Sequence, residues 1–381
     1  MPQKWIRKKR LDFFRALSTF TGTIIGVGIF GLPYVAMKAG FFVVVLYFVF
    51  VALLSIAISN LYGEICCDTQ KLARTPGYAE EYISPKAKKF SFAISSLVLI
   101  GALLAYLIVG GEFLYLLMSS FLGGSSLFYT LLFLAIGALF IYKGMTKIAQ
   151  FEFIMLVIFF VILIFFFFQS LPFIHSDHFL TFDWRLITFP YGVIIFALSG
   201  LPMVPEIKEM VNRDRSQLRK VIIWGTIISA IAYLIFIIAF LGATGPITSE
   251  NAISGFAALV GPKIILIGYL FGLITTFTSF ITLGLTLRKM LNYDFKIPKR
   301  VSWFLACFVP LFIYFLGVKN FLDVIGLTGA IVLAIESILI IFIYKNFIQK
   351  RFQRKAPWTI YLVLFFLLVG VIFEVIYFFV R

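Results

Sequence analysis

The sequence contains few cysteines, few histidines and few charged residues. Only three of its 381 residues are Cys, two are His, and 13% are Asp, Glu, Lys or Arg. The three cysteines, Cys66, Cys67 and Cys307, lie in or beside apolar segments, so neither a disulfide framework nor a cysteine metal site is predicted. The nucleotide-binding pattern Gly-x-x-x-x-Gly-Lys-Ser/Thr is absent as well, so an ATP-driven pump would need a separate subunit.

Apolar residues are correspondingly abundant. They make up 62% of the chain, and 48 positions are Phe. A soluble protein of this length could not bury so much apolar surface, so we expect the solvent to be a lipid bilayer. Runs of about 17–25 apolar residues are typical of transmembrane helices. The sequence predicts an all-α polytopic membrane protein with eleven such helices, at residues 12–37, 41–66, 90–120, 126–142, 151–171, 187–206, 219–244, 264–288, 301–317, 321–344 and 358–380.

The basic residues are distributed unevenly between the two sets of connecting segments. Of the 33 Lys and Arg residues, 28 fall in the N-terminal segment and in alternate loops. Loops of that kind usually face the cytoplasm. We therefore expect a multi-pass protein of the cell membrane with its N-terminus inside and its C-terminus outside, and with no affinity for nucleic acid. The basic start is not followed by a cleavage site, so we interpret it as leading into an uncleaved first span.

Two longer loops are expected on the outer side. Residues 172–185 contain both histidines, His175 and His178, which could bind a metal ion. A solvated loop is the simpler interpretation, because no third ligand is in view. Residues 245–262 are small and apolar, which suggests a short re-entrant or lid helix.

A Gly-Leu-Pro motif occurs in both the first and the sixth predicted span, at residues 31–33 and 200–202. Each copy follows an Ile-Ile pair and a break of small residues. Five spans separate the starts of the two copies, so the second copy crosses the membrane in the opposite direction. The pattern predicts a five-plus-five inverted repeat with broken helices 1 and 6, as in many secondary transporters. The domains are then a basic N-terminus (1–11), two five-helix repeats (12–171 and 187–344) and an additional helix 11 (358–380).

A helix that breaks in the middle of a membrane predicts a binding site. The break exposes amide N–H groups and carbonyl oxygens, whose partial charges suit the carboxylate and the ammonium group of an amino acid. Glycines let a ligand approach the backbone, and prolines remove donors near the break. The simpler alternative is that the kinks ease helix packing, with Gly26 and Gly28 as contact points.

Several stretches are similar to those of a known superfamily. The segment GTIIGVGIFGLPYVAMKAG resembles its first helix, YGEICCDTQ the loop after helix two, and FALSGLPMVPEIKE its sixth helix. These stretches resemble the amino acid–polyamine–organocation superfamily. The segment LLAYLIVGGEFL and the count of eleven spans are similar to its amino acid/auxin permease-like branch, which includes tyrosine/tryptophan permeases and neutral amino acid transporters. The resemblance implies the fold of the bacterial leucine transporter.

The resemblance also implies a substrate site. In that fold the amides after the break in helix one bind the substrate carboxylate, and carbonyl groups of helix six face the amino group. Tyr106 in helix three would be a wall or gate residue. The implied substrate residues are Gly26, Val27, Gly28, Tyr106, Phe196, Ala197 and Ser199.

Hydroxyl groups line one face of the eighth predicted span, at residues 275, 278, 279, 282 and 286. They could bind Na⁺, or they could bond the carbonyl oxygens of their own helix. The resemblance adds that two of them match the hydroxyl pair of the sodium site in sodium-coupled members. It also favours Na⁺ because the fifth span has no Lys, which some proton-coupled relatives carry there. The implied sodium residues are Gly22, Ile25, Thr275, Thr278 and Ser279.

Ionisable residues inside membrane spans are functional candidates by default. Glu112 in helix three could select a cationic side chain, carry a proton or bond a neighbouring backbone group. Glu336 in helix ten could carry a proton or make a structural hydrogen bond. The remaining carboxylates near helix ends are interpreted as inner gate or loop salt bridges (Glu64, Glu206 and Glu209) and as a structural residue (Glu374).

These observations predict a secondary active transporter, and not an enzyme, that moves a neutral or aromatic amino acid by alternating access with Na⁺ as the coupling ion. No cofactor is expected besides that ion. The alternative is a proton-coupled symporter, or an exchanger of cationic amino acids or polyamines that uses Glu112. A membrane-embedded enzyme would need converging catalytic side chains inside the spans, and a channel would need polar stripes on several helices. The sequence shows neither pattern.

Overall fold

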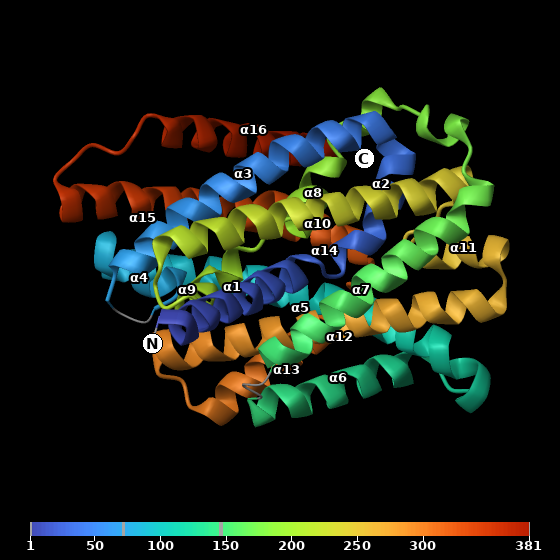
Figure 1. Ribbon diagram of the computed structural model, residues 1–381, viewed down its shortest axis with the longest axis horizontal. Helices are drawn as coiled ribbons and strands as arrows, with labels where there is room; N and C mark the ends of the chain where they lie inside the picture. Colours follow the sequence, from blue (N-terminus) through green and yellow to red (C-terminus); the bar gives the residue numbers. More distant parts are fainter. Residues whose placement is uncertain (1, 71–72, 145–147, 381) are drawn as a thin grey trace.

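The computed structural model describes residues 2–70, 73–144 and 148–380, which form a bundle of helices (Figure 1). No strand occurs within these ranges. The helices are α1 (Pro2–Ile24), α2 (Gly28–Ala39), α3 (Phe41–Asp68), α4 (Thr75–Tyr82), α5 (Pro85–Leu122), α6 (Ser126–Lys143), α7 (Ile148–Ser170), α8 (Pro190–Ala197), α9 (Val204–Met210), α10 (Arg215–Thr244), α11 (Ile253–Val260), α12 (Pro262–Phe295), α13 (Lys299–Phe315), α14 (Phe321–Leu327), α15 (Ala334–Phe352) and α16 (Thr359–Val380).

Each of the eleven predicted spans coincides with a helix or a broken helix. Within the described residues, eight helices are long and apolar enough to cross a membrane, and the bent pair α1 and α2 makes a ninth span. The other two predicted spans correspond to α13, which has 17 residues, and to α16. The boundaries differ most at the first span, because α1 begins at Pro2 and not at residue 12. The third span lies within α5, which extends over 38 residues. The Ser84 side chain caps its start by accepting a hydrogen bond from the Ala87 amide.

The first predicted span consists of two helices with a break between them. α1 ends at Ile24 and α2 begins at Gly28, and their axes differ by 49°. Gly26 lies in the three-residue break, where a Cβ atom would collide with the Tyr106 hydroxyl group. α1 already begins at Pro2, so the described part of the predicted basic N-terminus (1–11) is helical, consistent with the good helix propensity of Lys and Arg.

The sixth predicted span is broken as well. α8 ends at Ala197, a 3₁₀ turn covers Leu201–Met203, and α9 follows. Pro202 and Pro205 lack amide protons, so a continuous helix could not form its normal bonds there. The breaks that the Gly-Leu-Pro motifs predict are therefore present in both spans.

A π-helical segment at Thr328–Leu333, between α14 and α15, packs against α8. Gly329 allows this close contact, since a Cβ atom there would collide with the Gly192 carbonyl oxygen of α8. Short π-helical segments occur frequently at functional sites because they widen the helix locally. The π-helical turn therefore packs against α8, the first half of the broken sixth span.

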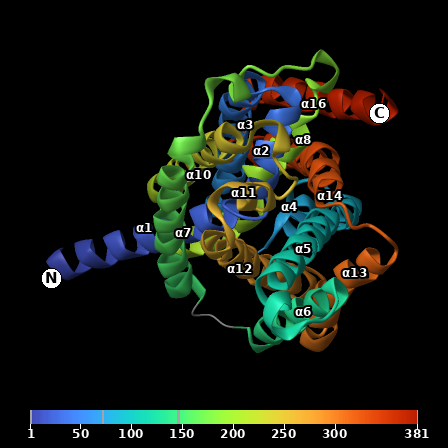
Figure 2. The ribbon, with the colours of Figure 1, turned by 90° about the vertical axis from the view of Figure 1, so that its right-hand side faces the viewer.

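The connecting segments differ between the two ends of the bundle. The N-terminus, α4, α9 and the link between α15 and α16 lie toward one end (Figure 1). We call this the basic end, because it carries the Lys- and Arg-rich segments 207–220, 288–300 and 345–357. At the opposite end the short helix α11 lies across the middle of the bundle in the end-on view (Figure 2). It contacts α10 and α12, and it is the short lid helix expected for residues 245–262.

Candidate functional site

The two helix breaks meet at a central cavity of about 30 Å³, which is room for roughly one water molecule. Five of the seven predicted substrate residues line this cavity, and none of its lining residues is charged. The remaining lining residues come mostly from α1, α5, α12 and the π-helical segment. The full lining is Thr23, Ile24, Gly28, Val98, Leu99, Ala102, Tyr106, Phe196, Ala197, Ser199, Pro202, Leu283 and Leu333.

The other two predicted substrate residues, Gly26 and Val27, lie in the break itself. The Tyr106 hydroxyl group sits so close to Gly26 that any side chain there would collide with it. The Val27 amide donates to no backbone carbonyl within the described part of the chain, and it lies against the Tyr106 hydroxyl. The break therefore presents an amide donor next to a phenol, an arrangement suited to an anionic group.

The α8 side of the cavity presents an unsatisfied hydroxyl group. Ser199 Oγ is buried and has no hydrogen-bond partner among the described residues. The two breaks are in close contact here, since a Cβ atom on Gly28 would lie 2.8 Å from Cβ of Ala197. Buried polar atoms are normally hydrogen-bonded, so an orphan hydroxyl in a cavity is a candidate ligand contact.

Tyr233 of α10 joins the two breaks and was not anticipated from the sequence. Its hydroxyl group lies 2.5 Å from the Ile24 carbonyl oxygen and 3.0 Å from the Ala197 carbonyl oxygen, and the side chain is fully buried. These carbonyls are the last of α1 and α8, which have lost their helical partners. The only signal in the sequence is a single Tyr within an apolar stretch, where a buried phenol needs a hydrogen-bond partner.

A second cavity of about 30 Å³ lies beside the first and shares Thr23 with it. It is formed by α1, α7, α12 and the residues just after α1. All five predicted sodium residues line it. The full lining is Gly22, Thr23, Ile25, Met155, Leu156, Ile158, Phe159, Ile162, Phe271, Ile274, Thr275, Thr278 and Ser279.

The backbone at this second cavity has unpaired carbonyl oxygens. In a continuous helix the amides of Gly26 and Ile29 would bond the carbonyls of Gly22 and Ile25, but they donate to Ile24 and Gly26 instead. Neither carbonyl accepts another backbone hydrogen bond within the described ranges. Carbonyl oxygens freed by a broken helix are typical ligands of Na⁺ in transporters.

The hydroxyl groups at the second cavity divide into two kinds. Thr275 and Thr278 donate to the carbonyls of Phe271 (2.8 Å) and Ile274 (3.1 Å) in their own helix, which is the structural alternative raised above. A hydroxyl that donates its proton in this way still has lone pairs for a cation. Ser279 Oγ is buried, faces the Tyr106 hydroxyl and has no partner of normal geometry within the described part of the protein. All of these carbonyl and hydroxyl ligands are oxygen atoms, which are the ligands that a hard cation such as Na⁺ prefers.

Aromatic side chains fill the space between the cavities and the lid helix α11. The ring centroid of Phe30 lies 4.8 Å from that of Phe113 and 6.0 Å from that of Phe236. Phe240 stacks on Phe236 at 4.2 Å and contacts Phe256 of α11 at 5.0 Å. All five rings are buried. This aromatic cluster closes the path toward the end opposite the basic end.

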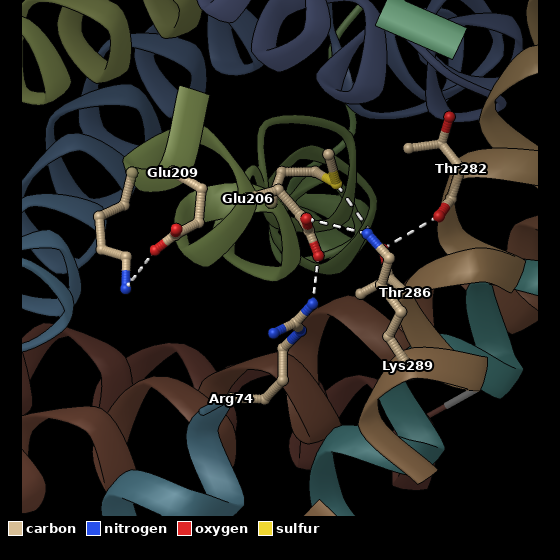
Figure 3. A network of polar contacts seen from close by, with 8 residues as sticks. Arg74, Glu206, Glu209, Thr282, Thr286 and Lys289 are labelled. Atoms are coloured by element: carbon tan, nitrogen blue, oxygen red, sulfur yellow. Dashed lines mark hydrogen bonds and ion pairs between the residues drawn. The ribbon is translucent and has the colours of Figure 1, made fainter. Parts of the chain in front are cut away.

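Ion pairs close the basic end. Glu206 of α9 bonds Arg74, which precedes α4, and its other oxygen lies 3.0 Å from Nζ of Lys289 on α12 (Figure 3). Arg74 is only 8% exposed, although the pair lies near the surface of the bundle. Lys208 also pairs with Glu209 at 2.9 Å. The salt bridges predicted for Glu206 and Glu209 are confirmed.

Glu64 forms no salt bridge with the residues that the structure describes. It accepts a hydrogen bond from the Tyr344 hydroxyl group at 2.9 Å, because α3 and α15 lie side by side here. Glu374 of α16 is buried as well, and one of its carboxylate oxygens has no partner among the described residues.

Glu336 is buried in a cluster of hydroxyl groups outside both cavities. The Ser95 hydroxyl lies 2.5 Å and the Thr75 hydroxyl 3.3 Å from the same carboxylate oxygen, and Thr75 also bonds Tyr62. The cluster joins α15 to α3, α4 and α5. Both alternatives raised for this carboxyl group, a structural hydrogen bond and a proton carrier, fit these contacts.

Glu112 lies between the substrate cavity and the lid. Its carboxylate accepts a hydrogen bond of 2.8 Å from the Asn251 side chain, just before α11. The partner is thus a side chain of the lid segment, and no hydrogen bond between Glu112 and a neighbouring backbone group occurs within the described ranges. Asn251 also bonds Ser254 through its side chain, so Glu112 is tied to the folded start of α11.

The two histidines belong to the loop that packs against α10. His178 Nδ1 lies 2.7 Å from the Gly242 carbonyl oxygen, and the His175 amide donates to the same oxygen. Within the described residues, no group of three His, Cys, Asp or Glu side chains is placed to hold a metal ion. These contacts support the loop interpretation.

The fold and the paired cavities define a class: a multi-pass membrane transporter with two helices broken at a common site. The chain belongs to the tryptophan/tyrosine permease family, whose model matches residues 9–380. It is a permease and not an enzyme. The family resemblance inferred from helices one, three and six is confirmed.

Individual relatives agree with this assignment. Glutamine transporter 2 from Aliivibrio fischeri is 22% identical over 330 residues, which is 84% of each chain. Among solved structures, the nucleobase-cation-symport-1 family transporter Mhp1, closed with bromovinylhydantoin bound, has a TM-score of 0.72 at 14% identity and covers 92% of this chain and 80% of its own. MhsT in complex with L-phenylalanine has a TM-score of 0.70 at 16% identity and covers 97% and 98%. These structures show that the fold is shared.

Proposed function

We propose that the protein is a secondary active transporter that moves a neutral or aromatic amino acid together with Na⁺ by alternating access. The observation that carries this proposal is the pair of adjoining cavities at the break after α1. Gly28 and Tyr106 line the first cavity beside the Val27 amide, and Gly22 and Ile25, whose carbonyls accept no backbone hydrogen bond within the described residues, line the second. A zwitterion and a cation are the ligands that such groups attract.

The lining of the first cavity supports the choice of substrate. The substrate carboxylate would bind the amides after the α1 break beside Tyr106, and the amino group would face the end of α8 at Phe196 and Ser199. The rest of the lining, including Val98, Leu99 and Leu283, is apolar and uncharged, which suits a neutral side chain. The family is named for tryptophan and tyrosine, one relative is named for glutamine, and MhsT was solved with L-phenylalanine; all four are neutral amino acids.

The present cavity is too small for an amino acid, so binding requires a movement. Tyr106 occupies the space beside Gly26, and the aromatic cluster and the ion pairs of Glu206 close the two ends. Opening one barrier at a time would give alternating access. We also propose that the basic end faces the cytoplasm, which places the N-terminus inside and the C-terminus outside.

Ion and substrate sites are positioned to act on each other. Gly22 and Ile25 line the second cavity, Gly28 lines the first, and Thr23 lines both. A cation bound to the carbonyls would hold the break in the shape that presents the amides. Coupling of this kind changes affinity by about 5–150-fold and must be reciprocal.

Equilibrium binding to the purified protein tests the proposal. Radiolabelled phenylalanine, tryptophan and glutamine would be bound in NaCl and in choline chloride. We expect Na⁺ to raise the affinity for at least one of them, and Thr278→Val to abolish that increase. Thr276→Val is the matched control, because Thr276 is buried on the same helix, bonds Gly272 and does not line either cavity.

A proton-coupled mechanism is the second candidate. It is favoured by the burial of Glu336 among hydroxyl groups, without a cationic partner among its hydrogen bonds in the described residues. Unchanged binding in choline chloride, together with uptake that needs a proton gradient and is lost in Glu336→Gln, would replace Na⁺ with H⁺ in this account. An exchanger of cationic substrates is less well supported, because Glu112 lines neither cavity and bonds Asn251.

A further inference from the structure

A wide cleft lies at the basic end, where the chain passes from α15 to α16. This link is at the left of Figure 1. Its volume is about 710 Å³, far larger than either central cavity. It lies away from the substrate and ion sites and shares no lining residue with them. The lining is Lys345, Gln349, Gln353, Arg354, Lys355, Ala356, Trp358 and Tyr361.

The cleft carries positive charges that no acidic lining residue neutralises. Lys345, Arg354 and Lys355 line it, and no acidic residue does. None of the three forms an ion pair with another residue in the described part of the chain. The nearest specific contact is a cation–π approach, with Lys345 Nζ 5.9 Å from the Tyr361 ring centroid. Amide groups of Gln349 and Gln353 add neutral donors beside the charges.

The floor of the cleft continues into an apolar surface. Trp358 is 73% exposed and Tyr361 is half exposed, as expected for aromatic rings at a membrane–water boundary. Beyond them Leu362, Phe365 and Leu368 of α16 are exposed too. The aromatic and apolar side chains thus extend along α16 from the charged cleft toward the centre of the membrane.

We propose that this cleft binds the headgroup of an anionic phospholipid. The phosphate would lie between Arg354, Lys355 and Lys345, and the acyl chains would lie along the exposed side of α16. Basic pockets between membrane helices recognise anionic headgroups in this way. A soluble phosphate would use the charges but not the adjoining apolar surface, so the combination favours a lipid.

The test counts lipids retained by the full-length protein. The chain would be placed in nanodiscs of phosphatidylcholine with a minor fraction of phosphatidylglycerol or cardiolipin, then analysed by native mass spectrometry. We expect preferential retention of the anionic lipid, and a loss of about thirtyfold in its affinity in the double variant Arg354→Gln/Lys355→Gln. Lys299→Gln/Arg300→Gln is the matched control, since it removes one Lys and one Arg that are equally exposed at the same end of the bundle.

Three results would overturn the proposal. Equal retention of the two lipid classes would mean that the cleft has no preference, and equal losses in both double variants would mean that only the general charge of this end matters. Displacement of the lipid by inorganic phosphate alone would assign the cleft to a soluble anion. Arg354→Lys/Lys355→Arg, which keeps the charge, should retain the lipid, and an unchanged melting temperature in phosphatidylcholine would show that every variant is folded.

Discussion

At the scale of single residues, one hydroxyl group links the two broken helices. Tyr233 lies within hydrogen-bond distance of the terminal carbonyls of both α1 and α8. Its ring packs against Phe48, which fixes it inside the bundle. A side chain from a third helix therefore holds the two breaks together at the cavity.

Removing this hydroxyl should destabilise the site. Tyr233→Phe removes the single phenolic proton that the two carbonyl oxygens share. Ile24 still accepts from the Gly26 amide, but the buried Ala197 carbonyl keeps no donor among the described residues, which costs about 1–3 kcal/mol. We expect a lower melting temperature and weaker substrate binding, measured by thermal unfolding and by equilibrium binding. Tyr142→Phe is the control, because Tyr142 is exposed and keeps its ring contact with Trp303. Equal stability of the two variants would show that Tyr233 does not support the breaks.

A second residue-scale prediction concerns pH. Lys9 donates a hydrogen bond of 2.8 Å to Asp214, which lowers the pKa of that carboxyl group below its usual value. A carboxyl group whose pKa is lower in the folded than in the unfolded protein stabilises the fold at pH values above the ordinary aspartate pKa. This added stability is lost as the pH falls through the lowered pKa of the folded protein. Asp214→Asn, which keeps an N-cap side chain for α10, should therefore melt below the wild type at neutral pH. The difference should vanish at acid pH, and a difference that persists there would contradict the assignment.

At the scale of elements, the lid helix α11 is attached to α5 through Glu112 and Asn251. The strained start of α11, with Ala252 at φ +57°, shows that the segment is held in place by its surroundings. We infer that Glu112 anchors the lid.

Hydrogen exchange of residues 251–260 distinguishes an anchor from a proton carrier. Glu112→Ala should raise the exchange rate of these amides, because Asn251 loses its acceptor. Glu112→Gln keeps an acceptor oxygen and should leave exchange and uptake close to wild type. If Glu112→Gln instead removes the pH dependence of uptake while exchange stays normal, the carboxyl group carries a proton.

The sequence predicted the positions of the elements and of the breaks, because glycine and proline act through the local backbone. Gly26 and Pro202 mark the two interrupted spans whatever surrounds them. The partners of the polar side chains were not predictable in this way. Tyr233 and Ile24 are 209 positions apart and Glu206 and Arg74 are 132 apart, so their pairing follows from helix packing that no local pattern encodes. Ten of the twelve predicted substrate and sodium residues line the cavities, and their roles stay predictions.

At the scale of the whole molecule, the structure is closed at both ends. The aromatic cluster lies on one side of the cavities and the Arg74–Glu206–Lys289 network on the other. A transporter of this kind must open each barrier in turn, so weakening one barrier should shift the balance between its states.

Glu206→Gln should favour opening at the basic end. It leaves Arg74, which is 8% exposed, without its charged partner, at a cost of about 2 kcal/mol or roughly thirtyfold in the ratio of open to closed states. Distances between spin labels on α4 and α9 would measure this shift. Glu80→Gln, which breaks the more exposed pair with Lys88, should leave the distances unchanged. An unchanged distribution in Glu206→Gln would show that the network is not a gate.

Uptake into proteoliposomes tests the central claim most directly. Vesicles containing the purified protein would be given a mixture of radiolabelled amino acids with an inward Na⁺ gradient, with a proton gradient, or with neither. The account predicts accumulation of a neutral or aromatic amino acid with the Na⁺ gradient only, lost in Thr278→Val and Ser279→Ala and retained in Thr276→Val. Proton-driven accumulation that survives in Thr278→Val and Ser279→Ala, or no gradient-dependent uptake by folded protein, would contradict it.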